Sequence, residues 1–139
     1  MERLKELFVP QGIKILETPT LAFAFLGDAV MTLVVRKILM ESGIITVNNL
    51  HKTASQFCSA TGQAQMLDSI LPHLNEEESQ IVRRARNTKT HKPPKNANIE
   101  TYKKATALEC LLGMLFAQEK FERIANLFMF GIIKTGEKL

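Results

Sequence analysis

Apolar residues along this chain recur every three or four positions, and no stretch keeps the strict alternation of a half-buried strand. This periodicity is typical of helices and predicts an all-α fold. The expected helices cover about residues 19–41, 47–56, 59–71, 76–86, 99–118 and 121–133. Residues 87–98, which contain prolines and several asparagines, are expected to form a loop between two of them.

Capping signals support several of these boundaries. Thr18 is a good N-cap residue, and Pro19 suits the first helical position after it. Gly43 is expected to end the same helix. Asn75 and Glu78 have the spacing of a capping box, so the acids at positions 76–78 are expected to stabilise a helix start. The first long helix is apolar on nearly all sides and is therefore expected to be buried.

Two acids stand alone within apolar helices. Asp28 interrupts the apolar run 21–35, and Glu109 interrupts the run 105–116. Moving a carboxylate out of water costs several kcal/mol unless something compensates the charge. Both residues are therefore candidates for a functional site.

Glycines next to these acids suggest how they meet. Gly27 precedes Asp28, and Gly113 lies one turn after Glu109 on the same face. Because glycine inside a helix costs about 1 kcal/mol relative to alanine, we expect the two helices to cross closely at these positions. Adjacent carboxylates repel unless one is protonated or a cation lies between them, and Mg²⁺ favours oxygen ligands. The interpretation is a Mg²⁺ site, with Mn²⁺ as a substitute.

A structural alternative is open at this stage. Asp28 could form an ion pair with Arg36, and Glu109 could form one with Lys103. The histidines show no spacing of metal ligands.

Positive charge is concentrated in one segment. The chain carries a net charge of +4, but residues 83–104 contain eight of its 18 Lys and Arg and one of its 14 acids. That segment therefore carries +7 and the remainder −3, a distribution that favours phosphate binding. Its asparagines and threonines suit phosphate and sugar contacts, and a single aromatic gives little support for base stacking. The predicted RNA contacts are Arg84, Arg86, Asn87, Lys89, Lys95, Asn96 and Tyr102.

The length and the charged positions bound the class of protein. The 139 residues suffice for one domain with one core, expected to span positions 1–139. Asp28, Arg36 and Lys37 argue against a transmembrane helix, and the charged N-terminus lacks a signal-peptide pattern. Cys58 and Cys110 are expected to be reduced, buried thiols in apolar surroundings. A cytoplasmic location is the expectation.

The motifs around the two acids resemble those of one family. The run Phe25-Leu-Gly-Asp28-Ala-Val30 resembles the signature of the ribonuclease III catalytic domain, and Ala107-Leu-Glu109-Cys-Leu-Leu-Gly113 is similar to its second acidic helix. The resemblance is closer to the compact Mini-ribonuclease III branch, which lacks a separate double-stranded-RNA-binding domain. Further similar segments, in the same order, are 50–52, 59–64, 84–87, 94–96 and 101–102.

This resemblance implies an all-helical homodimer with two active centres in a valley that holds double-stranded RNA. It implies Mg²⁺-dependent hydrolysis to 5′-phosphate and 3′-hydroxyl ends, in maturation of the precursor of large-subunit (23S) ribosomal RNA. Asp28 and Glu109 match the catalytic, metal-binding acids of the family. Ala24 and Thr106 stand where full-length ribonuclease III carries two further acids. Thr106 is expected to orient a metal-bound water.

Two other functions compete with this one. A non-catalytic, ribosome-associated RNA-binding module could share the fold, but it would have no need of isolated acids in apolar helices. A helical interaction protein without an RNA partner would leave the charge of the segment 83–104 unexplained.

Overall fold

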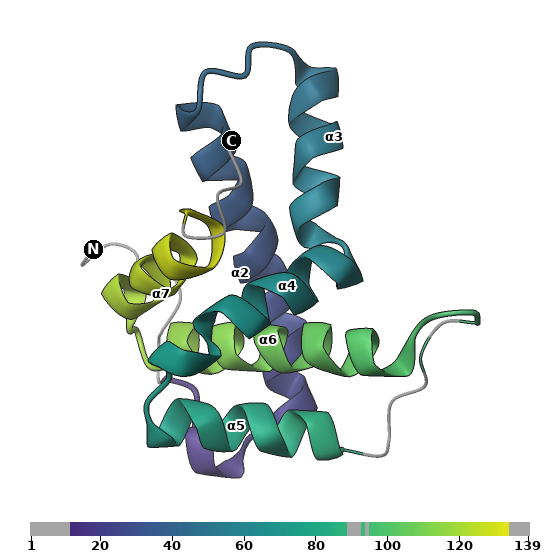
Figure 1. The fold of residues 1–139 in the computed structure, drawn as a ribbon. Coiled ribbons are helices and arrows are strands. Elements are labelled where there is room, and N and C mark those ends of the chain that lie inside the picture. The colour runs from purple at the N-terminus through teal and green to yellow at the C-terminus, as the bar shows by residue number, and fades with distance from the viewer. Residues whose placement is uncertain (1–11, 89–92, 94, 134–139) are drawn as a thin grey trace.

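This computed structural model describes residues 12–88, 93 and 95–133. Helices joined by short connections make up this part of the molecule (Figure 1). No strand occurs in these residues, so the predicted all-α class is confirmed. In chain order the elements are η1 (Ile15–Glu17), α2 (Thr20–Glu41), α3 (Val47–Cys58), α4 (Ala60–Ile70), η2 (Leu71–His73), α5 (Glu76–Asn87), α6 (Ile99–Ala117), α7 (Phe121–Phe128) and η3 (Met129–Ile133).

The expected helices form with ends within two residues of the predicted positions, but three local details differ. Thr18 does not cap α2, because its hydroxyl donates to the carbonyl of Lys14 (2.7 Å) and closes the turn of η1. The helix expected over 59–71 ends at Ile70, since Pro72 has no N–H to continue it. The helix expected over 121–133 changes to π geometry from Met129 onward.

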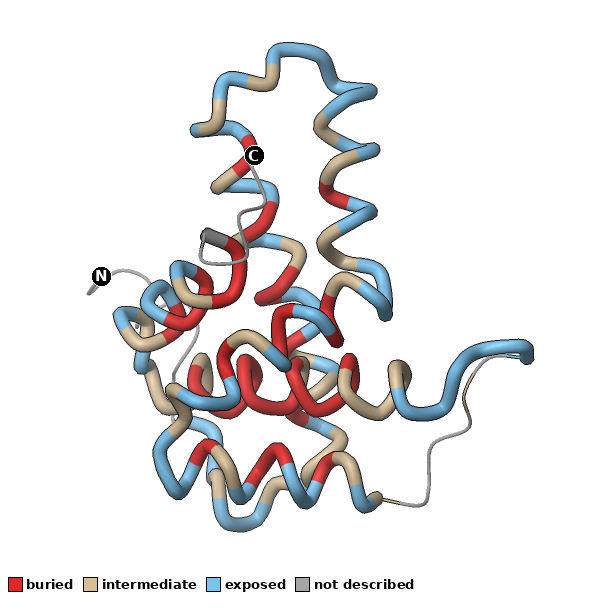
Figure 2. The backbone as a smooth tube through the Cα atoms, viewed as in Figure 1, coloured by how far each residue is buried: buried red, intermediate tan, exposed pale blue. Residues whose placement is uncertain are grey.

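The helix α6 forms the centre of the molecule. It lies across the middle of the structure, with α2 passing behind it, and α2, α4 and α5 all pack against it (Figure 1). Its middle and later turns are buried, whereas its first turns are exposed or intermediate (Figure 2). Its buried residues are Ala105, Thr106, Ala107, Leu108, Cys110, Leu111, Leu112, Gly113, Met114 and Leu115. A helix that is apolar on most of its sides must be buried, and packing by three other helices buries α6 in this way.

The first long helix was predicted to be buried, and in the single chain this holds for one face only. One face of α2 packs on the core through residues such as Phe23, Val30 and Val35. The opposite face leaves Phe25 (87% exposed), Leu33 (65%) and Met40 (74%) in contact with solvent in the single chain. No helix among the described residues is long and apolar enough to cross a bilayer.

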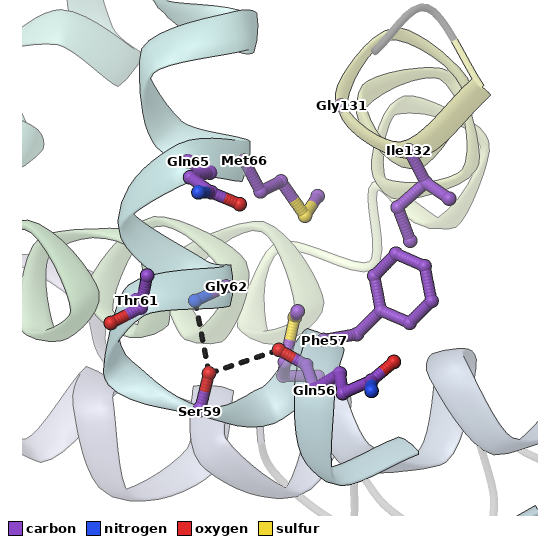
Figure 3. Close-up of a pocket in the computed structure, with 10 residues that line it drawn as sticks. Gln56, Phe57, Ser59, Thr61, Gly62, Gln65, Met66, Gly131 and Ile132 are labelled. Atoms are coloured by element: carbon purple, nitrogen blue, oxygen red, sulfur yellow. Dashed lines mark hydrogen bonds between the residues drawn. The ribbon is translucent and has the colours of Figure 1, made fainter. Parts of the chain in front are cut away.

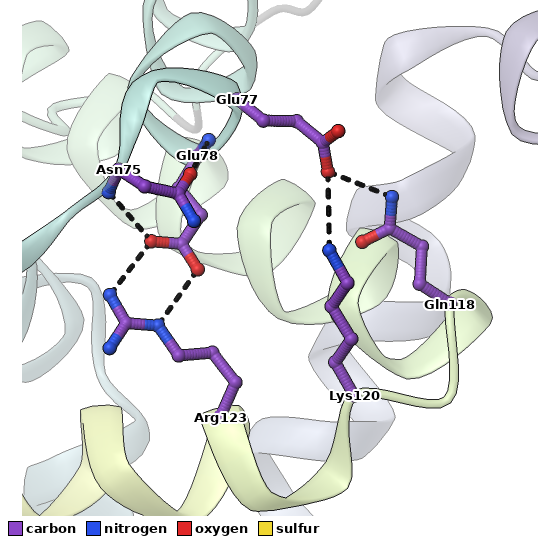
Figure 4. Close-up of polar contacts among 6 residues, drawn as sticks. All are labelled: Asn75, Glu77, Glu78, Gln118, Lys120 and Arg123. Atoms are coloured by element: carbon purple, nitrogen blue, oxygen red, sulfur yellow. Dashed lines mark hydrogen bonds and ion pairs between the residues drawn. The ribbon is translucent and has the colours of Figure 1, made fainter.

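A buried ion pair connects the start of α5 to α7. Glu78 is 1% exposed and forms the predicted capping box with Asn75, each backbone N–H donating to the other's side chain at 2.9 Å (Figure 4). Arg123 donates to both carboxylate oxygens of Glu78 (2.9 and 2.8 Å) and to the carbonyl of His73 (2.6 Å). Burial would raise the pKa of Glu78, but Arg123 and the Asn75 backbone lower it below its ordinary value. Glu78 therefore has a structural role, as was predicted for the acids at the start of this helix.

Candidate active site

The site is built on a crossing of α2 and α6 in which the two backbones touch. A Cβ placed on Gly27 would lie 1.7 Å from the carbonyl oxygen of Glu109. A Cβ placed on Gly113 would lie 1.9 Å from the carbonyl oxygen of Phe23. No side chain larger than hydrogen fits at either position, so the predicted crossing at the two glycines is confirmed.

This crossing brings the two isolated acids together. Asp28 directly follows Gly27, whose Cα approaches the backbone of Glu109. Burial raises the pKa of Glu109 from an ordinary value of 4.5 to about 7, and the charge of Asp28 and hydrogen bonding with it contribute to that rise. Desolvation and a like charge both disfavour the ionised carboxylate. The two carboxylates therefore lie close together, and no ion pair from the described residues neutralises either of them.

The two acids differ in burial. Glu109 is partly buried at the edge of the core, whereas Asp28 is exposed. Asp28 does lie within the apolar helix α2, as expected, but the burial of its charge that this position implied was wrong, because the residue is exposed to solvent. The desolvation cost inferred from the sequence thus falls mainly on Glu109. A site at this edge is open to a ligand from solvent.

The structural alternative is not seen in the described residues. Neither Asp28 nor Glu109 forms an ion pair there, with Arg36, Lys103 or any other cation. Two neighbouring carboxylates, of which Glu109 has a raised pKa, match the chemistry of a divalent-cation site. No group of three or more His, Cys, Asp and Glu side chains that could hold a metal occurs in that part of the chain. A cation here would therefore take further ligands from water and substrate, as Mg²⁺ commonly does.

The environment of Cys58 differs in part from the prediction. Burial raises the pKa of its thiol, and the charges of Asp28 and Glu109 raise it further, whereas Thr32 and Arg36 lower it. This thiol packs against the apolar core, as predicted, but it is only half-buried and lies near the two carboxylates. Cys110 does match the prediction, because it is buried and free and its thiol donates to the carbonyl of Thr20 (3.3 Å).

Two polar residues lie buried beside the acids on α4 and α6. Thr106, predicted to orient a water, is 8% exposed and lies one turn before Glu109. Gln63, which the sequence reasoning missed, is 3% exposed. Its Nε2 donates to the carbonyl of Cys58 (3.1 Å), and its Oε1 accepts no hydrogen bond from a described residue. Its burial could have been predicted from its spacing, because Gln63 shares a face of α4 with the buried Leu67 and Ile70.

The described members of the predicted RNA-binding set lie at the end of α5, in the segment before α6 and in the first turn of α6. Thr20, Gln80, Arg83, Arg84, Asn87 and Thr88 line an open hollow of about 600 Å³. Arg83 and Arg86 are paired with Glu76 (3.2 Å) and Glu100 (3.5 Å). Arg84 and Lys95 are exposed and form no ion pair with a described residue.

Of the remaining predicted RNA contacts, Asn96 and Tyr102 lie in the described residues. Asn96 is exposed, with a positive φ of 73°, and Tyr102 is partly buried. Asn98 caps α6 by accepting from the N–H of Thr101 (3.0 Å), so its side chain serves the fold. Lys89 lies outside the described residues, and the predicted contact at this position stays a prediction.

Comparison with known proteins gives consistent matches. Residues 21–120 match the family model of the ribonuclease III domain. The Mini-ribonuclease 3 of Brevibacillus brevis is 44% identical over 110 residues, which is 79% of this chain and 82% of that protein. The Mini-ribonuclease 3 of Symbiobacterium thermophilum is 40% identical and covers 80% of this chain and 85% of its own length. That of a Thermoanaerobacter species is 37% identical, with coverages of 91% and 88%.

A solved structure has the same fold. The crystal structure of a Fusobacterium nucleatum protein superposes with a TM-score of 0.74 at 33% sequence identity. The match covers 87% of this chain and 95% of that one.

The raised pKa of Glu109 predicts how the stability of the metal-free protein depends on pH. Between the ordinary value of 4.5 and about 7, the folded state retains a proton that the unfolded state has lost. The free energy of unfolding should therefore fall as pH rises through this range and level off above it. Urea unfolding in the presence of a chelator at pH 5, 6, 7 and 8 measures this dependence. In Glu109→Gln the decline should be absent, and an equal decline in both proteins would contradict the assignment.

Proposed function

Since this chain belongs to the ribonuclease III domain family and to its Mini-ribonuclease 3 group, it is an endoribonuclease, and we propose that it hydrolyses double-stranded RNA with a divalent cation held by Asp28 and Glu109. The observation that carries the proposal is the pair of neighbouring carboxylates at the crossing of α2 and α6. Their repulsion, with no ion pair to relieve it in the described residues, favours a bound cation.

The chemistry follows from the kind of ligands present. A bound Mg²⁺, or Mn²⁺ in its place, would lower the pKa of a coordinated water and stabilise charge on the scissile phosphate. Asp28 and Glu109 would be its oxygen ligands, and Thr106, one turn before Glu109 on α6, would orient the attacking water. Water would attack phosphorus, the bond to the 3′ oxygen would break, and the departing oxygen would take up the proton that the water releases. The products are a 5′-phosphate and a 3′-hydroxyl.

The proposed substrate is a duplex, recognised through its backbone. Arg84, Asn87 and Lys95 are exposed at the end of α5 and in the following segment, where they would contact phosphates and sugars. Double-stranded RNA is read largely by shape and by 2′-hydroxyl and phosphate contacts. The family resemblance supports a precursor of large-subunit (23S) ribosomal RNA as the natural substrate. A cytoplasmic location is part of the same proposal.

The uncovered face of α2 supports a homodimer. Phe25, Ala29, Leu33 and Met40 are exposed and follow the three- and four-residue spacing of one helix face. A large exposed apolar patch marks an interaction surface, and a two-fold symmetric pair would bury the same patch on both chains. Asp28 lies beside this face, so such a dimer would bring two sites close to one duplex.

Replacing Asp28 with asparagine tests the catalytic role. A metal contributes several kcal/mol of transition-state stabilisation, so Asp28→Asn should reduce cleavage of duplex RNA in Mg²⁺ by about 1,000-fold or more. RNA binding and the melting temperature should change little. Asp68→Asn is a matched control, because that exposed carboxylate pairs with Lys104 (2.9 Å). Undiminished cleavage by Asp28→Asn would exclude the assignment, and RNA that is bound but uncut by the unaltered protein would favour a binding module.

Charge reversal tests the basic surface. Each lost phosphate contact should reduce the slope of log affinity against log salt by about 1, so Arg84→Glu with Lys95→Glu should reduce it by about 2. The control is Lys14→Glu with Lys120→Glu, which changes the net charge equally at residues that pair with nearby acids. Filter binding of duplex RNA at several salt concentrations gives both slopes. Equal slopes for the two double variants would remove Arg84 and Lys95 from the RNA interface.

A charge on the apolar face tests the dimer. Phe25→Glu should convert a particle of twice 15.6 kDa into one of 15.6 kDa in sedimentation equilibrium, because a carboxylate buried in the dimer would lack a partner. Met129→Glu places the same charge on another exposed apolar residue (57% exposed) outside α2 and should leave the mass unchanged. A Phe25→Glu protein that keeps the mass of the unaltered protein would refute this choice of interface.

A further inference from the structure

The exposed side of α3 carries hydrogen-bond donors and no acid. After Val47 at its first position, the exposed residues of this helix are Asn48, Asn49, His51, Lys52, Ser55 and Gln56. Each of their side chains can donate a hydrogen bond. No Asp or Glu occurs in the chain between Glu41 and Asp68. The helix α5 is different, because its exposed residues include Glu76 and Glu77.

The fold does not use these donors. None of the six side chains on the exposed side of α3 forms a hydrogen bond or an ion pair with a described residue. Arg36 on α2 adds a further cation. It is exposed and has no ion pair in the described residues, whereas the neighbouring Lys37 pairs with Glu41. Arg36 and His51 line the same hollow of about 160 Å³ between α2 and α3.

These groups lie on the other side of the acids from the basic end of α5. Thr20, the first residue of α2, lines the same open hollow as Arg84 and Asn87. Along the axis of α2, Asp28 lies about 12 Å beyond Thr20 and Arg36 about 12 Å beyond Asp28, at 1.5 Å per residue. The helix α3 packs beside α2 and returns toward the crossing with α6 (Figure 1). The acids are therefore flanked by cations in both directions along α2.

The corner between α3 and α4 holds α3 in this position. A Cβ placed on Gly62 would lie 2.2 Å from the carbonyl oxygen of Gln56 and 2.6 Å from that of Phe57, so the two helices touch there through their backbones. Figure 3 shows the Gly62 N–H donating to the hydroxyl of Ser59 (3.0 Å), which donates to the Gln56 carbonyl (2.9 Å). Because α4 packs on α6, which carries Glu109, this corner fixes the exposed side of α3 relative to that acid.

We propose that the exposed side of α3, together with Arg36, is a second surface for double-stranded RNA. Arg36 and Lys52 bind phosphates, and the neutral side chains donate to phosphate and 2′-hydroxyl oxygens. The inference rests on the proposed function. Duplex RNA is recognised mainly through its backbone and 2′-hydroxyls, which require cations and donors, and a surface without carboxylates does not repel the polyanion. A backbone bound on both sides of the acids holds the scissile phosphate in place between them.

The first test removes the two cations. Each lost phosphate contact should reduce the slope of log affinity against log salt by about 1, so Arg36→Gln with Lys52→Gln should reduce it by about 2. Lys14→Gln with Lys120→Gln is the control, since it removes two charges from lysines that pair with nearby acids. Filter binding of duplex RNA with a chelator present gives both slopes without cleavage. Equal slopes for the two double variants overturn the inference, as does a loss of slope that accompanies a change of particle mass in sedimentation equilibrium.

The second test removes two neutral donors from the same helix. Asn48→Ala with Ser55→Ala should weaken binding of duplex RNA by about 10-fold and leave the salt slope unchanged, because hydrogen bonds are lost without loss of charge. Asn126→Ala, on the exposed side of α7, is the control and should bind as the unaltered protein does. An affinity of the α3 variant equal to that of Asn126→Ala overturns the inference.

Binding by the unaltered protein separates this inference from the proposed function. If the unaltered chain does not bind duplex RNA, the proposed substrate fails and the inference fails with it. If it binds, and the variant at Arg84 and Lys95 lowers the salt slope while the variant at Arg36 and Lys52 does not, only the second surface is overturned.

Discussion

The contact between the backbones of α2 and α6 is the constraint on which the rest of the structure depends. Gly27 and Gly113 allow each helix to approach the carbonyl groups of the other, at distances that no Cβ could tolerate. A contact between backbones has no rotamers, so it fixes Asp28 relative to Glu109 more firmly than packed side chains could. The same contact places α6 at the centre, where α4 and α5 complete its burial. Stability and the candidate site therefore share one origin.

Most charges that take part in the fold are neutralised locally. Glu78 is buried against Arg123, and Lys104 pairs with Asp68 (2.9 Å). Among the described residues, the neighbouring carboxylates at the α2–α6 crossing have no such compensation. The fold thus leaves a pair of acids beside a solvent-facing helix surface, while Arg84 at the end of α5 forms no ion pair with a described residue. The proposed function depends on this separation, because a polyanionic substrate would be held by the basic residues while the two acids stay available for a cation.

Several features could be predicted because they depend on residues close in sequence. The capping box of Asn75 and Glu78 forms as expected, and Gly43 adopts the positive φ (91°) of a helix end. The crossing at Gly27 and Gly113 was predictable for another reason. A glycine within a helix is unfavourable by itself, so its presence indicates a close neighbour. The exposure of one face of α2 in the single chain could not be predicted from the sequence. An apolar helix face can be covered by the same chain or by a second one, and the local residue pattern is the same in both cases.

The sequence by itself determined the helices, the concentration of positive charge and the two acids that break apolar runs, since periodicity, capping and charge are local properties. Only the tertiary structure decided that Asp28 is exposed while Glu109 is partly buried, that Cys58 lies beside both, and that Gln63 is buried on α4. The physical reason is that burial and electrostatic coupling depend on which helices meet and at what angle. Those relations are set by packing between segments far apart in the chain, and no local pattern encodes them.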